Sequence, residues 1–254
     1  MKNNIVVMNL SGTYEKENFY KEVNSKILNC REVTGTNCYC DSEGECVLKS
    51  KIKDFEPDGI HFIDSGNYHY ITKFWTDKIK KNFDLIVFDH HTDMKESMFW
   101  SLLSCGSWVK DVLDNNKYIK KVILIGPAEK YTNQIEDKYK DRVIVIDDKE
   151  VEKRDIHHIA DSLNIKEPVY ISVDKDILST KTIKTNWDQG DLSLKELEEI
   201  LKDFMEKEEV IGIDICGEPG NEDGQADYIL DNKVNKELMD LAIEECNKDI
   251  ELVK

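Results

Sequence analysis

Short apolar segments rich in Val and Ile recur along the chain, and most of them are continuous rather than alternating with polar residues. Continuous apolar segments of this length are typical of strands that are covered on both faces, as in a parallel sheet. The pattern predicts strands over residues 5–8, 59–63, 85–88, 122–125, 143–146, 169–173 and 210–215.

Several of the intervening segments are charged and long enough to form helices. Ser193 and Glu196 form a capping-box pattern, in which two side chains satisfy free N–H groups in the first turn of a helix. The helix expected after them has an apolar face made of Leu197, Ile200, Leu201 and Phe204. A second helix is expected over residues 233–247, with Leu238, Leu241, Ala242 and Cys246 on one side.

The alternation of strands and helices predicts a mostly parallel sheet with helices on both faces. Hydrophobic residues make up 40% of the 254 residues and aromatic residues 9%, which is enough to bury a core and argues against intrinsic disorder. With only four prolines, twelve glycines and no repeat, the chain has no clear linker. We therefore expect a single α/β domain over residues 1–254.

The chain is strongly acidic, with 52 Asp and Glu against 35 Lys and Arg and a formal net charge of -17. A nucleic-acid-binding protein needs a basic surface to meet the phosphates, so we expect no nucleic-acid partner. Anionic membrane surfaces are disfavoured for the same reason, and no segment approaches the roughly 20 apolar residues that a membrane span needs.

The seven cysteines and the start of the chain bear on the cellular compartment. The apolar segment at the start is too short and too mixed for the core of a signal peptide. Without an export signal, an odd number of scattered cysteines is typical of reduced thiols, and we expect a cytoplasmic protein. Cys30, Cys38, Cys40 and Cys46 have a spacing that fits no standard zinc pattern, so we expect unpaired thiols there.

Acidic residues follow two of the predicted strands at their carboxyl ends, where open parallel sheets bind ligands. The third predicted strand is followed by the sequence DHHTD and the sixth by DKD. Because side chains alternate along an extended chain, Asp89 and His91 are expected to point the same way, as are Asp174 and Asp176. Lys175 is expected to point away, which keeps its ammonium group out of the acidic cluster.

Two further residues are expected to join this cluster. Asp93 would lie about 13 Å beyond Asp89 if the strand continued at about 3.3 Å per residue, so the chain must curl after His91. His69 follows the second predicted strand after a Gly-Asn turn signal, on the same edge of the sheet. Strand-end aspartates also commonly cap turns and helices, so each residue taken alone could be structural.

The combined cluster contains four carboxylates and two imidazoles, more donors than the four or so that one zinc ion takes. The six residues are His69, Asp89, His91, Asp93, Asp174 and Asp176. They suit two divalent ions, whose positive charges balance those of the four aspartates. Carboxylate and imidazole donors are compatible with Mn²⁺, and the set lacks the thiolates that would indicate zinc.

The same segments resemble the signature motifs of the arginase/agmatinase/formiminoglutamase (ureohydrolase) family. The sequence DHHTD, residues 89–93, is similar to the family's D-x-H-x-D motif, and SVDKD, residues 172–176, is similar to its S-x-D-x-D motif. The sequence GNYHY, residues 66–70, is similar to the G-G-D-H-S motif only at the first Gly and the His. The motifs occur in the family's order, and the resemblance extends from about residue 59 to residue 219.

The resemblance implies an arginase-like, three-layer α/β/α fold and a binuclear manganese site. One ion would be bound by His69, Asp89, Asp93 and Asp174, and the other by Asp89, His91, Asp174 and Asp176. A hydroxide that bridges the ions would cleave a linear C–N bond in a guanidino, amidino or formimino compound. The substrate would be a small molecule or a peptide-borne group, and members of the family often assemble into homo-oligomeric rings.

Two positions depart from the family's pattern. The family has a Glu that contacts the substrate in a D-[VI]-x-E motif, whereas this chain has Gly217 at that position and Glu218 one residue later. The family also often has a proton-shuttling His about a dozen residues after D-x-H-x-D, where this chain has Cys105. Glu218 as a substrate contact and Cys105 as a proton shuttle are therefore the candidate catalytic residues.

Other interpretations are compatible with the same residues. If the two departures abolish catalysis, the chain would be a metal-binding homologue with a regulatory or interaction role. The structural alternatives are an exposed loop acid for Glu218 and a small packed residue for Cys105. Two ions could also serve another hydrolytic reaction, although the acidic surroundings disfavour phosphoester substrates.

Overall fold

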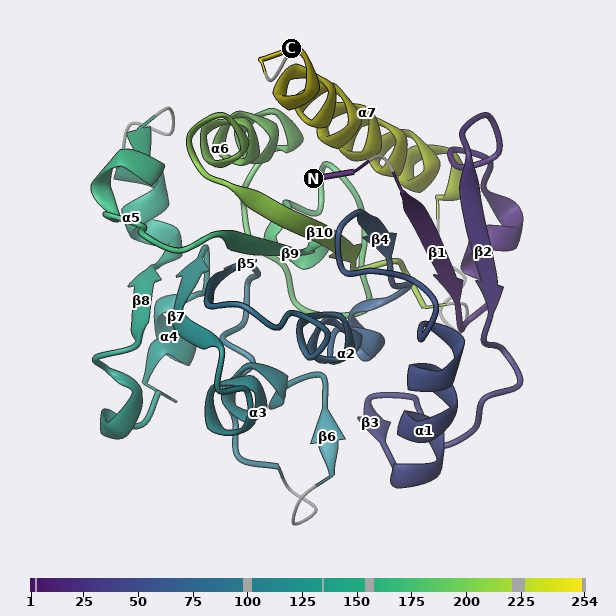
Figure 1. The fold of residues 1–254 in the computed structure, drawn as a ribbon, viewed down its shortest axis with the longest axis horizontal. Helices are drawn as coiled ribbons and strands as arrows, with labels where there is room; N and C mark the ends of the chain where they lie inside the picture. Colours follow the sequence, from purple (N-terminus) through teal and green to yellow (C-terminus); the bar gives the residue numbers. More distant parts are fainter. Residues whose placement is uncertain (3, 98–101, 134, 154–157, 221–226, 253–254) are drawn as a thin grey trace.

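The computed structural model describes residues 1–2, 4–97, 102–133, 135–153, 158–220 and 227–252 of the chain. Its centre is an eight-stranded sheet with the order β2-β1-β4-β10-β9-β5-β7-β8, in which every neighbouring pair is parallel (Figure 1). The strands are β1 (Ile5–Asn9), β2 (Ser25–Asn29), β4 (Ile60–Phe62), β5 (Phe83–Phe88), β7 (Ile119–Ile125), β8 (Val143–Ile146), β9 (Val169–Asp174) and β10 (Val210–Cys216). All seven strands that the apolar pattern predicts are among them.

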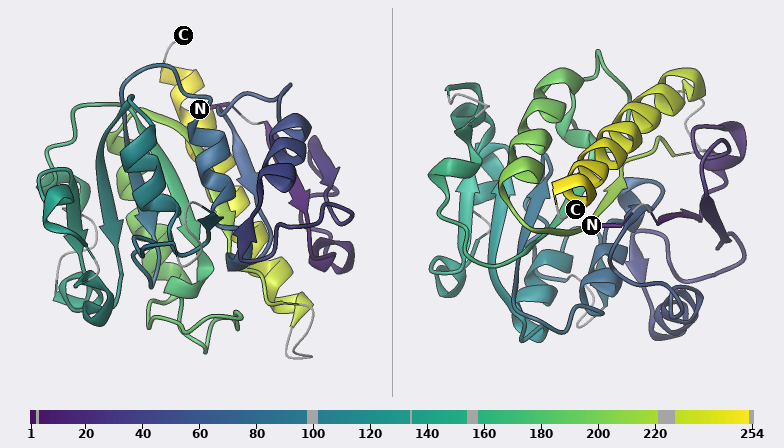
Figure 2. Two further views of the ribbon diagram at one scale, coloured as in Figure 1. Left: turned by 90° about the horizontal axis from the view of Figure 1, so that it is seen from below. Right: turned by 45° about the horizontal axis from the view of Figure 1, so that its top comes forward.

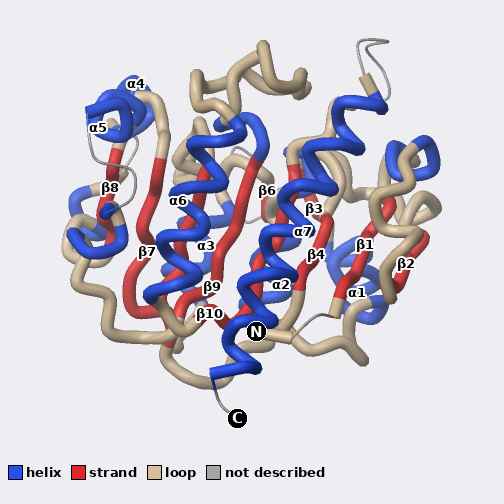
Figure 3. The backbone as a smooth tube through the Cα atoms, turned by 90° about the horizontal axis from the view of Figure 1, so that it is seen from above, coloured by secondary structure: helices blue, strands red, loops and turns tan. Residues whose placement is uncertain are grey.

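Helices cover both faces of this sheet (Figure 3). The helices α1 (Ser42–Lys51), α2 (Ile71–Thr76) and α3 (Trp108–Asn115) lie on one face. The helices α6 (Leu194–Lys207) and α7 (Tyr228–Leu252) pack side by side on the other (Figure 2). One apolar cluster fills the space on each side of the sheet. This arrangement confirms the predicted three-layer α/β/α fold with a mostly parallel central sheet.

The remaining helical segments are short. The helices α4 (Glu129–Thr132) and α5 (Asp148–Lys153) lie near β8 at one end of the sheet (Figure 1). The described residues form the 3-10 helices η1 (Thr13–Lys16), η2 (Gly66–Tyr68), η3 (Asp137–Tyr139), η5 (Ala160–Ser162) and η6 (Lys175–Ile177). In the described part of the chain, no helix has both the length and the apolar character that crossing a membrane requires.

The two long helices follow their sequence signals. The Ser193 hydroxyl accepts a hydrogen bond from the Glu196 N–H at 3.3 Å, and the Glu196 carboxylate accepts one from the Ser193 N–H at 2.8 Å. This capping box starts α6, and the predicted apolar face of the helix is buried. The helix α7 covers the predicted residues 233–247 but begins earlier, at Tyr228.

Three strands have no signal in the apolar pattern. The strand β2 forms one edge of the sheet and is partly exposed, with Ile27 52% exposed, so its sequence need not be continuously apolar. The strands β3 (Tyr39–Cys40) and β6 (Leu103–Ser104) form a separate antiparallel pair. Strands of two residues are too short to show a period, yet this pair places Cys38 beside Cys105.

Candidate active site

Six polar side chains converge at the carboxyl edge of the sheet, where its parallel strands end. They come from the residue after η2, from the segment that follows β5, and from the end of β9 with the start of η6. They are the six predicted metal ligands, His69, Asp89, His91, Asp93, Asp174 and Asp176, and all six are buried. The fold therefore brings together residues that lie more than a hundred positions apart in the sequence.

The first group of donors is centred on His69. Its Nδ1 atom lies 3.2 Å from Asp89 Oδ2, 3.1 Å from Asp93 Oδ2 and 3.6 Å from Asp174 Oδ2. This Nδ1 atom is buried, and among the described residues it has no hydrogen-bond partner of acceptable geometry. Buried polar atoms are normally satisfied, so the arrangement points to a ligand that the protein itself does not supply.

The second group is centred on His91. Its Nδ1 atom lies 2.8 Å from Asp176 Oδ2 and 3.3 Å from Asp89 Oδ1. Asp89 directs one carboxylate oxygen to His69 and the other to His91, so it joins the two groups. Two neighbouring sets of donors that share a carboxylate are an arrangement suited to a pair of ions.

The far side of each imidazole is also held. The Nε2 atom of His69 lies 2.9 Å from Ser172 Oγ, and the Ser172 hydroxyl donates to Asp214 Oδ1 at 2.6 Å. The Nε2 atom of His91 lies 2.9 Å from Asp188 Oδ1. Metal-binding histidines commonly use the second ring nitrogen in this way, which fixes the ring and its tautomer. Asp188 and Asp214 were not predicted; Asp214 shares the signal of an aspartate near a strand end.

The predicted curl after His91 is present. Asp93 has φ 49°, in the left-handed region that Asp tolerates better than most residues. The turn carries the Asp93 carboxylate back to His69, where the indole N–H of Trp108 donates to it at 2.6 Å. Backbone and side chain together hold Asp93 in the cluster.

The cluster holds four buried carboxyl groups close together, and their proximity shifts the pKa values of its residues. Burial alone would lower the pKa of His91, but its contacts with Asp176 and Asp89 raise the pKa above the ordinary value. Burial and the nearby charge of Asp89 raise the pKa of Asp93 to about 6. Carboxylates at this spacing repel one another, so the cluster requires positive charge from protons or from cations.

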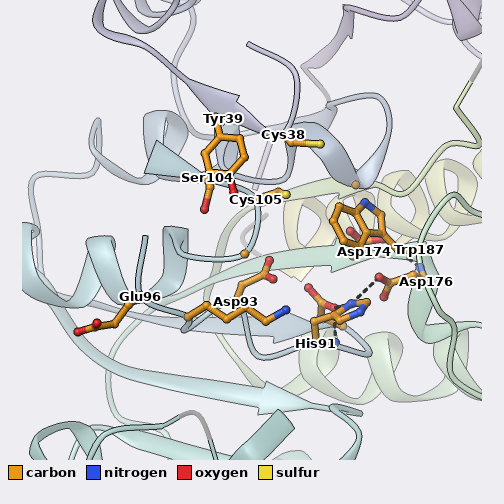
Figure 4. Close-up of a pocket in the computed structure, with 14 residues that line it drawn as sticks. Cys38, Tyr39, His91, Asp93, Glu96, Ser104, Cys105, Asp174, Asp176 and Trp187 are labelled. Atoms are coloured by element: carbon orange, nitrogen blue, oxygen red, sulfur yellow. Dashed lines mark hydrogen bonds and ion pairs between the residues drawn. The ribbon is translucent and has the colours of Figure 1, made fainter. Parts of the chain in front are cut away.

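Five of the six residues, all except His69, line a pocket of about 270 Å³ (Figure 4). Figure 4 shows His91 and Asp176 close together, with Tyr39 farther away in the wall. The remaining wall includes Cys38, Lys95, Glu96, Ser104, Cys105 and Trp187. Trp187 is 37% exposed, so its ring is accessible at the pocket. An aromatic ring beside several carboxylates favours a cationic ligand.

Cys105 lies in the pocket wall where β3 and β6 meet. Its backbone N–H donates to the Cys38 carbonyl at 2.9 Å, and both residues line the pocket. A hydrogen bond with Cys38 raises the pKa of the Cys105 thiol, and burial raises that pKa further. A thiol that holds its proton this firmly is a poor proton shuttle near neutral pH, so the surroundings favour a packing role.

Glu218 lies apart from the pocket, in a buried polar cluster. The side chains of Glu218 and Lys175 are both fully buried and form an ion pair. Asn235 accepts from Lys175 Nζ at 2.8 Å and donates to Glu218 Oε1 at 2.8 Å and to Glu17 Oε2 at 2.7 Å. Lys175 therefore points away from the six-residue cluster, as predicted. Glu218 is thus engaged by Lys175 and is not among the residues that line the pocket, and its contact with a substrate stays a prediction.

The backbone at Gly217 explains the direction of Glu218. Gly217 has φ 93°, which interrupts the alternation of an extended strand and turns the next side chain away from the pocket. A Cβ atom at this position would lie 2.5 Å from Asp174 Oδ1 and 2.6 Å from the backbone nitrogen of Lys175. Only glycine fits such a position without strain, so this backbone has no room for the family's Glu.

We expect Gly217→Ala to lower the free energy of unfolding by about 1–3 kcal/mol, because alanine disfavours this φ and would collide with Asp174. The matched control is Gly106→Ala, where the added Cβ would meet only Lys95 Cδ, at 3.6 Å. Its expected effect is within about 0.5 kcal/mol. Urea denaturation measures both variants, and equal stability of the two would contradict this account.

Cys216 is a residue of the site that sequence reasoning missed. It ends β10, and its Sγ atom lies 3.2 Å from Asp174 Oδ2. The ligand atoms of His69, Asp174 and Cys216 lie within 4.8 Å of one another. Its signal was its position two residues after Asp214 at a strand end, the same signal that identified Asp174 and Asp176.

The other cysteines agree with the expectation of reduced thiols. All seven lie in the described part of the chain and none forms a disulfide; Cys30 and Cys40 are buried, Cys38 is half-buried and Cys46 is exposed. Burial raises the pKa of both Cys30 and Cys40 to about 11, so these two thiols are unreactive at neutral pH.

The sequence of this chain is similar to a known family and to an individual known protein. A model of the arginase family matches residues 60–218. An uncharacterized protein of Thermotoga maritima is 29% identical over 220 residues, which cover 85% of this chain and 80% of that protein.

Solved structures share the fold at low sequence identity. The agmatine ureohydrolase of Thermoplasma volcanium has a TM-score of 0.69 and 18% identity, and the match covers 97% of this chain and 92% of that one. The formimidoylglutamase of Bacillus subtilis has a TM-score of 0.70 and 17% identity, covering 97% and 87%. A triple mutant of a T. brucei arginase-like protein, bound with Mn²⁺, has a TM-score of 0.63 and 15% identity, covering 96% and 90%.

Proposed function

Because the chain belongs to the arginase family, we propose that it is a binuclear metal-dependent hydrolase that cleaves a linear C–N bond of a guanidino, amidino or formimino compound. The observation that carries the proposal is the buried cluster of four carboxylates and two imidazoles beneath an open pocket. The family match and the likeness to ureohydrolase structures support a hydrolase.

The donor set fits two divalent ions. One ion would be held around His69, with Asp89, Asp93 and Asp174, and the other around His91, with Asp89, Asp174 and Asp176. The buried His69 Nδ1, which lacks a hydrogen-bond partner among the described residues, supports a cation at the first position. Carboxylate and imidazole donors suit Mn²⁺, which is the ion that we propose.

The reaction would consume one water, whose oxygen forms a bond to the amidine carbon while the C–N bond to the amine breaks. From a guanidine, the products would be urea and a protonated amine. The bound ions would polarise the attacking water and make it nucleophilic near neutral pH. The carboxylates around the pocket would attract a cationic guanidinium group, and the Trp187 ring would contact its planar face. The net charge of -17 would add a long-range attraction for such a substrate, whether a small molecule or a peptide-borne group.

The departures from the family pattern leave two positions to be filled by other groups. Glu218 is engaged with Lys175, and Cys105 holds its proton firmly. The titratable residues of the pocket wall outside the cluster include Tyr39, Lys95 and Glu96, so proton transfer would fall to one of these or to solvent. We also expect assembly into homo-oligomers, which light scattering can test.

Metal analysis combined with a product screen tests the proposal. The protein is reconstituted with Mn²⁺, its metal content is measured, and it is incubated with guanidino, amidino and formimino compounds. We expect two ions per chain and release of urea, ammonia or formamide from at least one compound. Binding of less than one ion would overturn the metal site. Two bound ions without any product would favour the regulatory homologue instead.

A further inference from the structure

The residue Cys216 occupies an unusual position beside the cluster. It is paired in register with Asp174 on the neighbouring parallel strand, so the two side chains lie on the same face of the sheet. The thiol is fully buried, and its Sγ atom lies 3.2 Å from Asp174 Oδ2. A soft sulfur donor is therefore built into a site whose other donors are hard oxygens and imidazole nitrogens.

Two separations around Asp174 and Cys216 are in the range found for ligands to one ion. Donor atoms bound to the same ion at about 2.0–2.3 Å lie about 3–3.6 Å from one another. The separations from Asp174 Oδ2 to the Cys216 sulfur, 3.2 Å, and to His69 Nδ1, 3.6 Å, are both in this range. The sulfur, His69 and Asp174 also form one group of ligand atoms within 4.8 Å.

An independent observation points to a ligand at this position. The Nδ1 atom of His69 belongs to a side chain that is 1% exposed, it faces the same group, and it has no hydrogen-bond partner among the described residues. Its other nitrogen is held by Ser172, so the ring cannot turn without losing that contact. The ring is therefore fixed with its Nδ1 atom, a possible metal ligand, directed at the group that Asp174 and Cys216 also form.

We propose that the Cys216 sulfur is a ligand of the ion at the His69 position, a proposal that rests on the proposed function because it requires a metal-loaded site. Binding forms a metal–sulfur bond, breaks the S–H bond and releases one proton to solvent. The added thiolate makes this position favour Zn²⁺, Co²⁺ or Fe²⁺ more than the His91 position, which has only oxygen and nitrogen donors. The two positions of the cluster thus differ in metal preference.

Cobalt absorption provides the direct test. The full-length protein is loaded with Co²⁺, and the thiolate-to-cobalt charge-transfer band in the near ultraviolet is recorded. We expect the band in the wild type, its loss in Cys216→Ser, and its retention in Cys105→Ser and Cys246→Ser. Cys105 lines the pocket and Cys246 is a buried cysteine of α7, so these controls separate coordination from proximity and from burial.

A competition experiment gives a second readout. The affinity for Zn²⁺ relative to Mn²⁺ is expected to fall at least about tenfold in Cys216→Ser, because a soft donor is removed. Circular dichroism establishes that the variant is folded, and Cys216→Ala serves in its place if the serine variant is not. Cobalt uptake without the band, or a band that persists in Cys216→Ser, would overturn this proposal alone. Absence of any cobalt uptake would overturn it together with the proposed metal site.

Discussion

Asp174→Asn is expected to reduce both metal content and catalytic activity, with kcat/KM falling by at least about a hundredfold. The Asp174 carboxylate lies next to His69 and accepts a hydrogen bond from the Asp176 N–H at 3.0 Å, so it borders both groups of donors. The substitution keeps the shape of the side chain but removes one negative charge and one strong donor. The variant should therefore stay folded while its metal binding is lost.

Asp84→Asn is the matched control. Asp84 is also a buried aspartate, but it lies near the start of β5, at the opposite end of the strand from Asp89, and accepts from the Lys121 N–H at 2.9 Å. We expect two ions per chain and activity within about twofold of the wild type in this variant. Metal is counted by elemental analysis of the dialysed protein. An Asp174→Asn protein that retains both ions would contradict the proposed site.

Lys175→Met is expected to lower the free energy of unfolding by about 3–5 kcal/mol. The reason is that Glu218 would then be left as a charged group with no counter-ion in a fully buried place. Burial alone would lower the pKa of Lys175, but the charge of Glu218, followed by that of Glu17, raises it, so the lysine is held in its charged form. Glu218→Gln should also destabilise the protein, because Lys175 would then be the buried charge without a counter-ion.

The double variant Lys175→Met/Glu218→Gln should recover at least half of that loss, because both buried charges are removed together. Urea denaturation of the wild type, the two single variants and the double variant provides the double-mutant cycle. The dependence of the unfolding free energy on urea concentration should have the same slope in all four. Lys236→Met is the exposed control; its partner Asp240 lies 2.9 Å away at the surface, and the expected change is within about 1 kcal/mol. Simple additivity of the two single variants would contradict the assigned pair.

This pair also bears on the site. Lys175 is the residue between Asp174 and Asp176, and its side chain is anchored on the other side of the backbone by Glu218 and Asn235. We infer that the anchor holds the two carboxylates in position from behind. The Gly at 217 and the Glu at 218 are thus linked departures from the family pattern, since the turn at one position directs the other to the lysine.

The local sequence by itself determined most of the architecture. Continuous apolar segments require burial on both faces, and this requirement alone identifies seven of the eight strands of the parallel sheet. A capping box determined where α6 begins. The six clustered residues were also readable, because the carboxyl ends of parallel strands meet at one edge and side chains alternate along each strand.

Tertiary structure decided what that local pattern does not encode. The edge strand β2 is exposed and therefore lacks the apolar signal. The direction of Glu218 depends on a left-handed Gly217 and on a buried lysine forty-three positions away, and neither leaves a periodic trace. Cys216 joins Asp174 only through strand pairing, and Asp188 joins His91 only through the folding of a loop. Local periodicity records which side chains must be buried, whereas the partners of a buried polar group are chosen by contacts between distant segments.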